Sequence, residues 1–170
     1  DRNDPAWERI TIEDGSDAAT VGQAGLVSMF VYTAYAGDQP GVVERNVFRN
    51  EGPDGLDSDR PYTYDVESAT GWYADRLHAY ERGGKTAYVW NVTFVDEANA
   101  TRFSDGYGRV AEHWGGERRA VERGTVWTFD GSESRFRGAV WIERDRNAVT
   151  IVKAPSRPAL DDVYAPAIAD

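Results

Sequence analysis

The segment ATGWYADRLHAYERGGKTAYVWNVTFVDEANATRF, residues 69–103, decides the fold of this chain of 170 residues. Two runs in which apolar residues alternate with polar ones flank the dipeptide Gly83-Gly84. Both glycines accept the positive φ that a two-residue hairpin turn requires, because they lack a Cβ atom. With this turn, Arg82 lies opposite Lys85, and the segment is predicted to form an antiparallel β-hairpin.

One face of this hairpin is predicted to be apolar and to lie in the core, because side chains two residues apart share a face of a strand. That face carries Leu77, Ala79, Tyr88, Trp90, Val92 and Phe94. Asp96 is a suitable N-cap for a helix that follows directly. The apolar residues of this helix, from Ala100 to Trp114, form one stripe. The hairpin and the helix are therefore expected to cover each other.

Before the hairpin, residues 21–36 read VGQAGLVSMFVYTAYA and are apolar nearly all round. A membrane-spanning helix needs about 20 apolar residues, and this run is shorter and contains polar residues. The run therefore predicts a buried core helix that ends at Gly37, which is suited to the C′ position. No transmembrane span is expected in this chain.

After the central helix, short strands are predicted, including a hairpin whose strands cover 136–143 and 148–153. A last helix is expected after Ser156, with Pro158 in its first turn. The predicted fold is α+β: an antiparallel sheet of about five to six strands, helices packed on one face, and an N-terminal buried helix. Residues 1–16 are expected to form an arm or edge strand. Residues 17–170 form a single domain, with a helical and loop subregion (17–70) and a sheet–helix core (71–170).

The charged residues are unusual in kind as well as in number. Formal net charge is −10, and there are seventeen Arg but only two Lys, with seventeen Asp. A Lys-poor, Asp-rich surface is typical of proteins in concentrated salt, where the screening length is about 3 Å at 1 M and self-repulsion costs little. The acidic balance also argues against nucleic-acid binding, which needs a basic face.

No catalytic motif and no cofactor site are apparent, so the chain is predicted not to be an enzyme on its own. There is no Cys, and the two His residues lie in no HExxH or similar motif. Asp54, Asp57 and Asp59 are candidate Ca²⁺ ligands, although they lack the spacing of an EF-hand. No other metal ligands are predicted.

Two N-x-T sequons give the clearest functional pattern, Asn91-Val92-Thr93 and Asn99-Ala100-Thr101. Asn99 lies just past the apolar stripe of the central helix, in its first turn, and is expected to be exposed and glycosylated. Asn91 lies in mid-strand, where the helix over residues 21–36 would bury its amide. Glycosylation is therefore expected less at Asn91 than at Asn99.

Several separated segments resemble, in order, the C-terminal region of a family of haloarchaeal secreted surface proteins of unknown function. They are GWYADRL at 71–77, AYVW at 87–90, DEANA at 96–100 followed by Phe103, and VTIVKAP at 149–155. The resemblance spans Val21 to Val163. Related extracellular proteins carry an upstream helix with an HExxH-like motif, often degenerate, which has no counterpart here. The resemblance implies an extracellular or cell-surface location and no established activity.

Together these observations predict a non-catalytic extracellular domain of a halophilic archaeon's surface protein, acting in binding, assembly or support of a partner domain. Its partners would be other copies of itself or an upstream domain of the same precursor, and it would carry an N-glycan. One alternative is the C-terminal fragment of a zinc-dependent or degenerate surface metallopeptidase. Another is a subunit of a surface filament that exchanges its N-terminal strand between copies.

Overall fold

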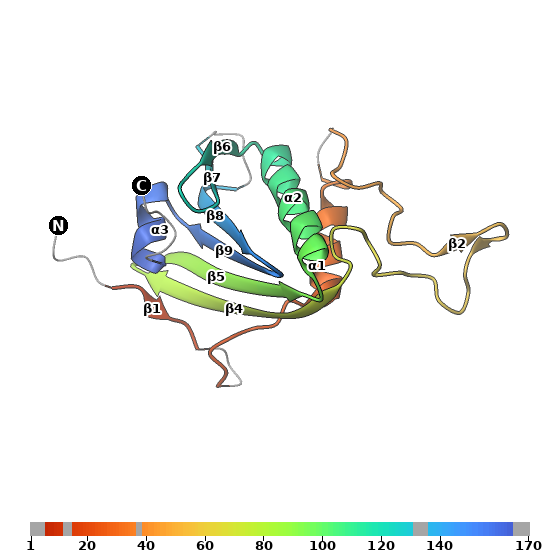
Figure 1. Cartoon of the computed structure of the whole chain (residues 1–170), viewed down its shortest axis with the longest axis horizontal. Coiled ribbons are helices and arrows are strands. Elements are labelled where there is room, and N and C mark those ends of the chain that lie inside the picture. Colours follow the sequence, from red (N-terminus) through yellow and green to blue (C-terminus); the bar gives the residue numbers. More distant parts are fainter. Residues whose placement is uncertain (1–5, 12–14, 37–38, 131–135, 165–170) are drawn as a thin grey trace.

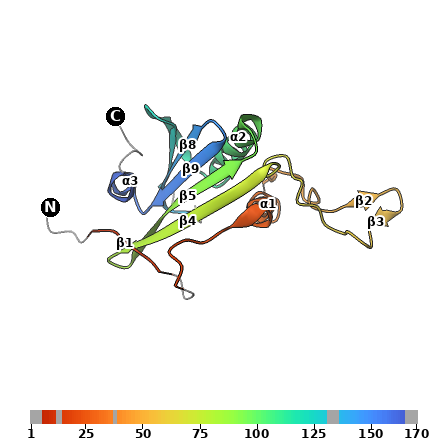
Figure 2. The ribbon, with the colours of Figure 1, turned by 60° about the horizontal axis from the view of Figure 1, so that its bottom comes forward.

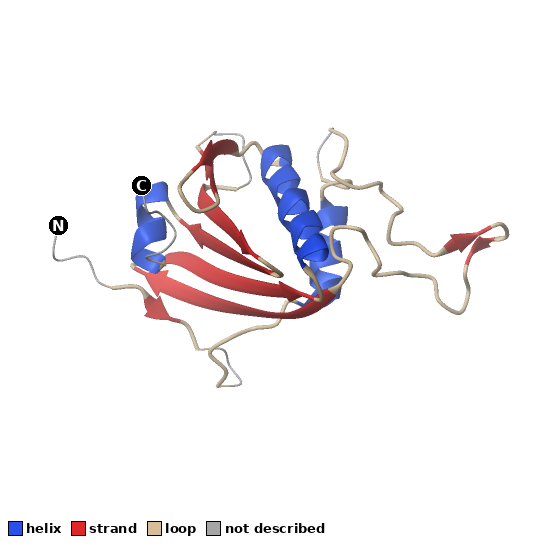
Figure 3. Cartoon of the chain, viewed as in Figure 1, coloured by secondary structure: helices blue, strands red, loops and turns tan. Residues whose placement is uncertain are grey.

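The computed structural model describes residues 6–11, 15–36, 39–130 and 136–164. Its main element is an antiparallel sheet of seven strands in the order β1-β4-β5-β9-β8-β7-β6 (Figure 1). The strands are β1 (Glu8–Arg9), β4 (Trp72–Arg82), β5 (Lys85–Phe94), β6 (Glu117–Ala120), β7 (Thr125–Phe129), β8 (Gly138–Asp145) and β9 (Ala148–Ala154). Two further short strands, β2 (Glu51–Gly52) and β3 (Gly55–Leu56), form a hairpin that stands away from this sheet (Figure 3).

The central hairpin has the register that the sequence predicts. Arg82 pairs with Lys85 across the turn, and Leu77 pairs with Trp90 further along the two strands. Gly83 and Gly84 both have positive φ, 57° and 75°, as a turn of the primed type requires. The long β4–β5 hairpin crosses the molecule and forms one side of the sheet (Figure 2).

Three helices complete the described structure: α1 (Gly22–Tyr32), α2 (Glu97–His113) and α3 (Arg157–Val163). The Asp96 carboxylate accepts a hydrogen bond from the Asn99 backbone N–H at 2.8 Å, which confirms Asp96 as the N-cap of α2. No helix in the described part of the chain is long and apolar enough to span a membrane.

The predicted arrangement of sheet and helices was wrong, although the chain does combine an antiparallel sheet with helices. The sheet has seven strands rather than five to six, and the helices cover both of its faces. Side chains of α1 and α2 pack with Trp90 and Phe94 on one face, whereas Leu160 of α3 packs with Val89 on the other. Five consecutive residues of β8, 138–142, are buried, so this strand is covered on both faces, which the prediction of helices on one face did not allow for.

The prediction of a buried N-terminal core helix over residues 21–36 was also wrong. The helix is shorter, and of its residues only Leu26, Val27 and Phe30 are buried, while Tyr32 is 51% exposed. A physical reason for the early end is the Thr33 hydroxyl, which donates to the Phe30 carbonyl at 2.6 Å and accepts from the Val42 N–H at 2.9 Å. An apolar run without periodicity does not reveal such a side-chain stop.

A buried carboxylate fixes the start of α1 against the sheet. Asp75 of β4 accepts hydrogen bonds from the backbone N–H groups of Val21 at 2.7 Å and Gly22 at 2.8 Å. It also accepts from the indole N–H groups of Trp72 at 2.9 Å and Trp90 at 3.3 Å. The anion satisfies N–H groups that a helix start leaves without partners. It thereby holds α1 over the face that α2 also covers.

Candidate functional site

An apolar cavity of about 440 Å³ lies between α1, α2 and the sheet, and we call it the Lys153 pocket. Its described lining is rich in aromatic side chains and comes from both helices and four strands. The lining residues are Gly25, Ser28, Met29, Tyr32, Tyr88, Tyr107, Val110, Ala111, Trp114, Phe129, Phe136, Val140 and Lys153.

The floor of the pocket is a row of residues across three neighbouring strands. Tyr88 of β5 is paired with Lys153 of β9, which is paired in turn with Val140 of β8. Val149 and Ile151 precede Lys153 on the same face of β9 and belong to the core beneath α1 and α2. Lys153 therefore occupies the position in this strand where the packed core gives way to the cavity.

Lys153 is half-buried and has no countercharge among the described residues. It makes no hydrogen bond and no ion pair with any residue in the described ranges, and none of the described lining residues is acidic. Burial lowers the pKa of its amine, because the charged form loses water without gaining a partner. An uncompensated cation in an apolar cavity is an unfavourable arrangement that a bound anion would relieve.

Two tyrosine hydroxyl groups lie at the same site. The hydroxyl oxygens of Tyr88 and Tyr107 are 3.5 Å apart, so either can donate to the other. Burial raises the pKa of Tyr88, and its hydrogen bond with Tyr107 partly offsets this. The pKa of Tyr107 lies well above its ordinary value, chiefly through burial and also through the charge and hydrogen bond of Tyr88. Both hydroxyls are therefore neutral donors at physiological pH.

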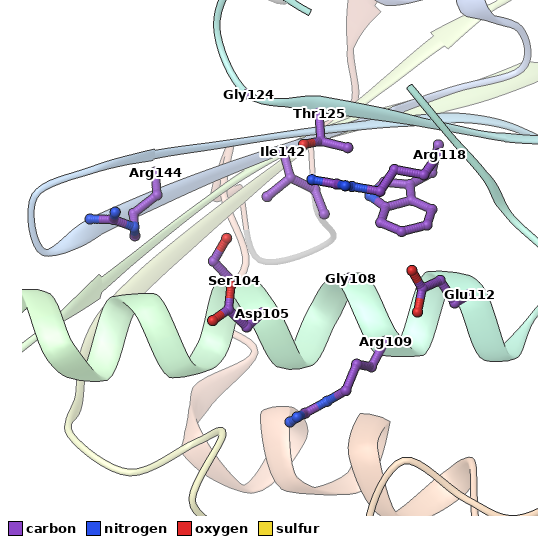
Figure 4. Close-up of a pocket in the computed structure, with 11 residues that line it drawn as sticks. Ser104, Asp105, Gly108, Arg109, Glu112, Arg118, Gly124, Thr125, Ile142 and Arg144 are labelled. Carbon is purple, nitrogen blue, oxygen red and sulfur yellow. The ribbon is translucent and has the colours of Figure 1, made fainter. Parts of the chain in front are cut away.

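A second hollow of about 400 Å³, the polar pocket, lies between α2 and strands β6, β7 and β8. Arg118 reaches toward Thr125 and Ile142, whereas Arg109 points away from the strands (Figure 4). Its lining is Ser104, Asp105, Gly108, Arg109, Glu112, Arg118, Gly124, Thr125, Trp127, Ile142 and Arg144. Most of the charged side chains are exposed, and Arg144 already pairs with Glu97 at 2.9 Å. Water solvates these charges, so this hollow is the weaker candidate.

The structure does not bring the predicted calcium ligands together. Asp54 and Asp59 are exposed near the β2–β3 hairpin, and one oxygen of Asp57 accepts the backbone N–H groups of Asp59 and Arg60, both at 2.9 Å. Across the described ranges, no three His, Asp or Glu side chains lie close enough to hold a metal ion. Asp57 is instead placed to stabilise the turn that follows β3.

The exposure expected for Asn99 was wrong, and the helix cover considered for Asn91 is absent from its face of the sheet. Asn99 is only 7% exposed, because its side chain packs against Gly71. Its amide N–H donates to the Asp96 carboxylate at 2.9 Å and its carbonyl accepts from Arg102 at 3.0 Å. Asn91 is exposed and accepts a hydrogen bond from the Thr150 hydroxyl at 3.0 Å. The helix α1 covers the other face of the sheet and so leaves Asn91 open.

The two histidines lie in different environments. His78 contacts the Asp17 carbonyl through Nδ1 at 2.9 Å. His113 packs edge-on against Trp114, with ring centroids 4.7 Å apart, and its Nε2 is buried without a hydrogen-bond partner among the described residues. Neither contact involves a carboxylate side chain.

Sequence reasoning placed Tyr88 and Tyr107 in the core but did not identify the pocket. A signal was present in β9, where Val149, Ile151 and Lys153 occupy one alternating face, so a lysine stands where an apolar residue is expected. The pocket itself depends on how α1 and α2 lie over the sheet, which local periodicity does not determine.

Comparison with known proteins gives a family match. A family model described as "Domain of unknown function (DUF8575)" matches residues 8–164. No curated protein and no solved structure matches the chain. The match includes the whole segment, Val21 to Val163, that resembles a family of unknown function.

Proposed function

The chain belongs to the family described as Domain of unknown function (DUF8575), and we propose that it is a non-catalytic binding domain that holds a small molecule in the Lys153 pocket. The observation that carries this proposal is the apolar, aromatic cavity of about 440 Å³ on the face of the sheet that α1 and α2 cover. Binding sites for small molecules are typically mostly apolar cavities of about 300–1,000 Å³ with a few placed polar groups. Here the placed groups are Lys153, Tyr88 and Tyr107.

The proposed setting is the surface of a halophilic archaeon, in a secreted protein that carries an N-glycan. The acidic, Lys-poor composition supports this setting. Binding would then serve assembly or support of a partner domain of the same precursor.

Occlusion of the cavity tests the binding function. Ser28 lines the Lys153 pocket from α1 and is exposed, so Ser28→Trp is expected to fill the cavity without disturbing the buried core. Titration of the neutral probe 3-phenylpropanol, followed by tryptophan fluorescence in molar KCl, is expected to show saturable binding that Ser28→Trp weakens at least tenfold.

The matched control is Ser104→Trp, which places the same side chain in the polar pocket. This variant is expected to bind 3-phenylpropanol as the unaltered chain does. Absence of saturable binding, or equal weakening by both variants, would contradict the proposal.

A second candidate function is self-assembly by exchange of the N-terminal strand, and the contacts of the arm favour it. Glu8 and Arg9 of β1 pair with Glu81 and Tyr80 at the edge of the sheet. Next to β1, the ring of Trp7 packs against the core on the face of the sheet that α3 covers. Its centroid lies 4.6 Å from the guanidinium carbon of Arg82. The arm of a second copy could occupy the same edge and the same Trp7 site.

Sedimentation at increasing protein concentration tests strand exchange. Oligomers are expected that Trp7→Ala abolishes and that Tyr73→Ala, at a position 70% exposed, does not. A monomer at every concentration would argue against exchange.

A further inference from the structure

We infer that the ligand of the Lys153 pocket is a small amphipathic anion, whose aromatic or alkyl body fills the cavity and whose anionic group binds the Lys153 amine. This inference rests on the proposed binding function and adds the chemical class of the ligand. It follows from the charge, the position and the neighbours of Lys153.

The charge argument begins with the lining. Of the described residues around the cavity, Lys153 alone has an ionisable group that is charged at neutral pH. The described ranges contain six ion pairs, and every one of them uses an arginine. Lys153 takes part in none of these pairs, so it is a half-buried cation without an anionic partner among the residues that the structure describes. A ligand with a negative charge complements it, whereas a neutral or cationic ligand leaves it unpaired.

The strand pairing of Lys153 places its side chain beside residues that line the apolar volume. Its residue pair across β5 is Tyr88, and directly paired side chains on one face have Cβ atoms about 4.5–5.5 Å apart. The pair across β8 is Val140, which also lines the cavity. A ligand that fills the cavity therefore lies against the lysine side chain.

The neighbouring hydroxyls give the anion further donors. Tyr88 and Tyr107 both line the cavity, and their pKa values, raised by burial, keep them protonated. A carboxylate accepts several hydrogen bonds at once and so can take one from the amine and another from a tyrosine. A single hydroxyl on a ligand offers fewer acceptor sites.

The remaining lining determines the body of the ligand. Aromatic rings of Tyr32, Trp114 and Phe136 line the cavity together with aliphatic side chains of α2. The ring centroids of Tyr32 and Trp114 are 5.7 Å apart, and those of Trp114 and Phe136 are 5.3 Å apart. Such a wall favours a flat ring or a short alkyl chain over a sugar or a peptide backbone.

A matched pair of probes tests the inference: 3-phenylpropionate and 3-phenylpropanol, which share one body and differ in the carboxylate. Calorimetric titration of the whole chain in molar KCl near neutral pH is expected to give about tenfold tighter binding of the carboxylate. Lys153→Met is expected to remove this preference and leave the binding of the alcohol unchanged, because methionine retains most of the length of the unbranched apolar stem and lacks the amine. Lys85→Met, at the exposed turn, is the control and is expected to keep the preference.

The possible results separate the two proposals. Saturable binding of the alcohol with no preference for the carboxylate would overturn the inference and leave the binding function standing. It would mean that Lys153 only covers the cavity with its hydrocarbon stem. Binding of neither probe would overturn both. Loss of the preference in Lys85→Met as well would assign it to net charge rather than to Lys153.

A second measurement needs no variant. An anion beside Lys153 raises the lowered pKa of the amine, so binding of 3-phenylpropionate near the amine pKa takes up protons. Calorimetry in two alkaline buffers of different ionisation enthalpy is expected to show this uptake for the carboxylate and not for the alcohol. Equal proton uptake with both probes would contradict the inference.

Discussion

At the scale of single residues, the hydrogen bonds of Asp75 give the GWYADR segment a structural role. Trp72 and Asp75 come from this segment, and Trp90 from the facing strand donates to the same carboxylate. Two further N–H donors to Asp75, from Val21 and Gly22, belong to the start of α1, so we regard this part of the sequence as structural. The proposed binding function uses residues farther along the sheet.

Asp75→Asn is expected to lower the free energy of unfolding by about 1–3 kcal/mol, because the amide group has one acceptor oxygen and turns an NH₂ toward N–H donors. Urea titration followed by circular dichroism measures the change. Asp105→Asn, at an exposed position of α2, is the control and is expected to be neutral. An equal effect of the two variants would show that the network around Asp75 contributes nothing special.

The sequons provide a second prediction at this scale. Asn99 is buried, and both the nitrogen and the oxygen of its side-chain amide are hydrogen-bonded. A glycan on the folded chain is therefore expected at Asn91 and not at Asn99. Peptide mass spectrometry of protein from its native host locates the modification. A glycan at Asn99 would require the first turn of α2 to open or the modification to precede folding.

At the scale of elements, two turn glycines allow the cost of backbone strain to be separated from the cost of a steric clash. Gly84 has φ 75° with nothing within 4 Å of an added Cβ, whereas at Gly71, with φ 74°, the Cβ would meet the Asn99 side chain at 2.5 Å. Gly84→Ala is expected to cost about 1–2 kcal/mol of stability through the backbone alone. Gly71→Ala is expected to cost more, because the same backbone strain is joined by a steric clash.

Thermal or urea unfolding of the two glycine variants measures this difference. The double change of Gly71→Ala with Asn99→Ala isolates the contact. If Gly71→Ala cost no more than Gly84→Ala, the close packing of Asn99 on Gly71 would be irrelevant to stability.

Local patterns predicted the elements well where one signal decided the structure. Gly83-Gly84 determined the register of β4 with β5, and Asp96 marked the start of α2. The placement of α3 on the opposite face and the cavity at Lys153 depend on contacts between distant segments, which no local pattern encodes. For Asn99, its position in a first helical turn was correct, but the contact with the Gly71 backbone that buries it is also long-range.

At the scale of the whole molecule, alkaline pH is expected to destabilise the fold through Tyr88 and Tyr107. Their pKa values are raised above the ordinary 10.0, so their contribution to stability is complete below that pH and is lost as pH rises through the folded-state pKa. Lys153 acts in the opposite direction, because the cost of burying its charge disappears once the amine is neutral. The tyrosine effect is expected to dominate at the highest pH.

The melting temperature measured from about pH 8 to about pH 11 follows this balance. Tyr107→Phe is expected to reduce the alkaline loss, whereas Tyr73→Phe, at an exposed position, is not. An identical pH profile for the unaltered chain and Tyr107→Phe would refute the assignment.

Salt is expected to stabilise the whole molecule, because a net charge of −10 repels itself and molar salt screens that repulsion. The melting temperature is expected to rise between low and molar KCl. A melting temperature that does not depend on KCl would remove the support for a halophilic setting.

The pairing of β5 with β9 also constrains the order in which the chain folds. Tyr88 and Lys153 are neighbours in the sheet, but the chain between them contains α2 and three further strands. The β4–β5 hairpin is local and can form early, whereas β9 joins it only after a long loop closes, which slows folding. The floor of the Lys153 pocket is therefore complete only at this late step. A ligand would bind the finished sheet and not its intermediates, so it would slow unfolding while leaving the rate of folding nearly unchanged.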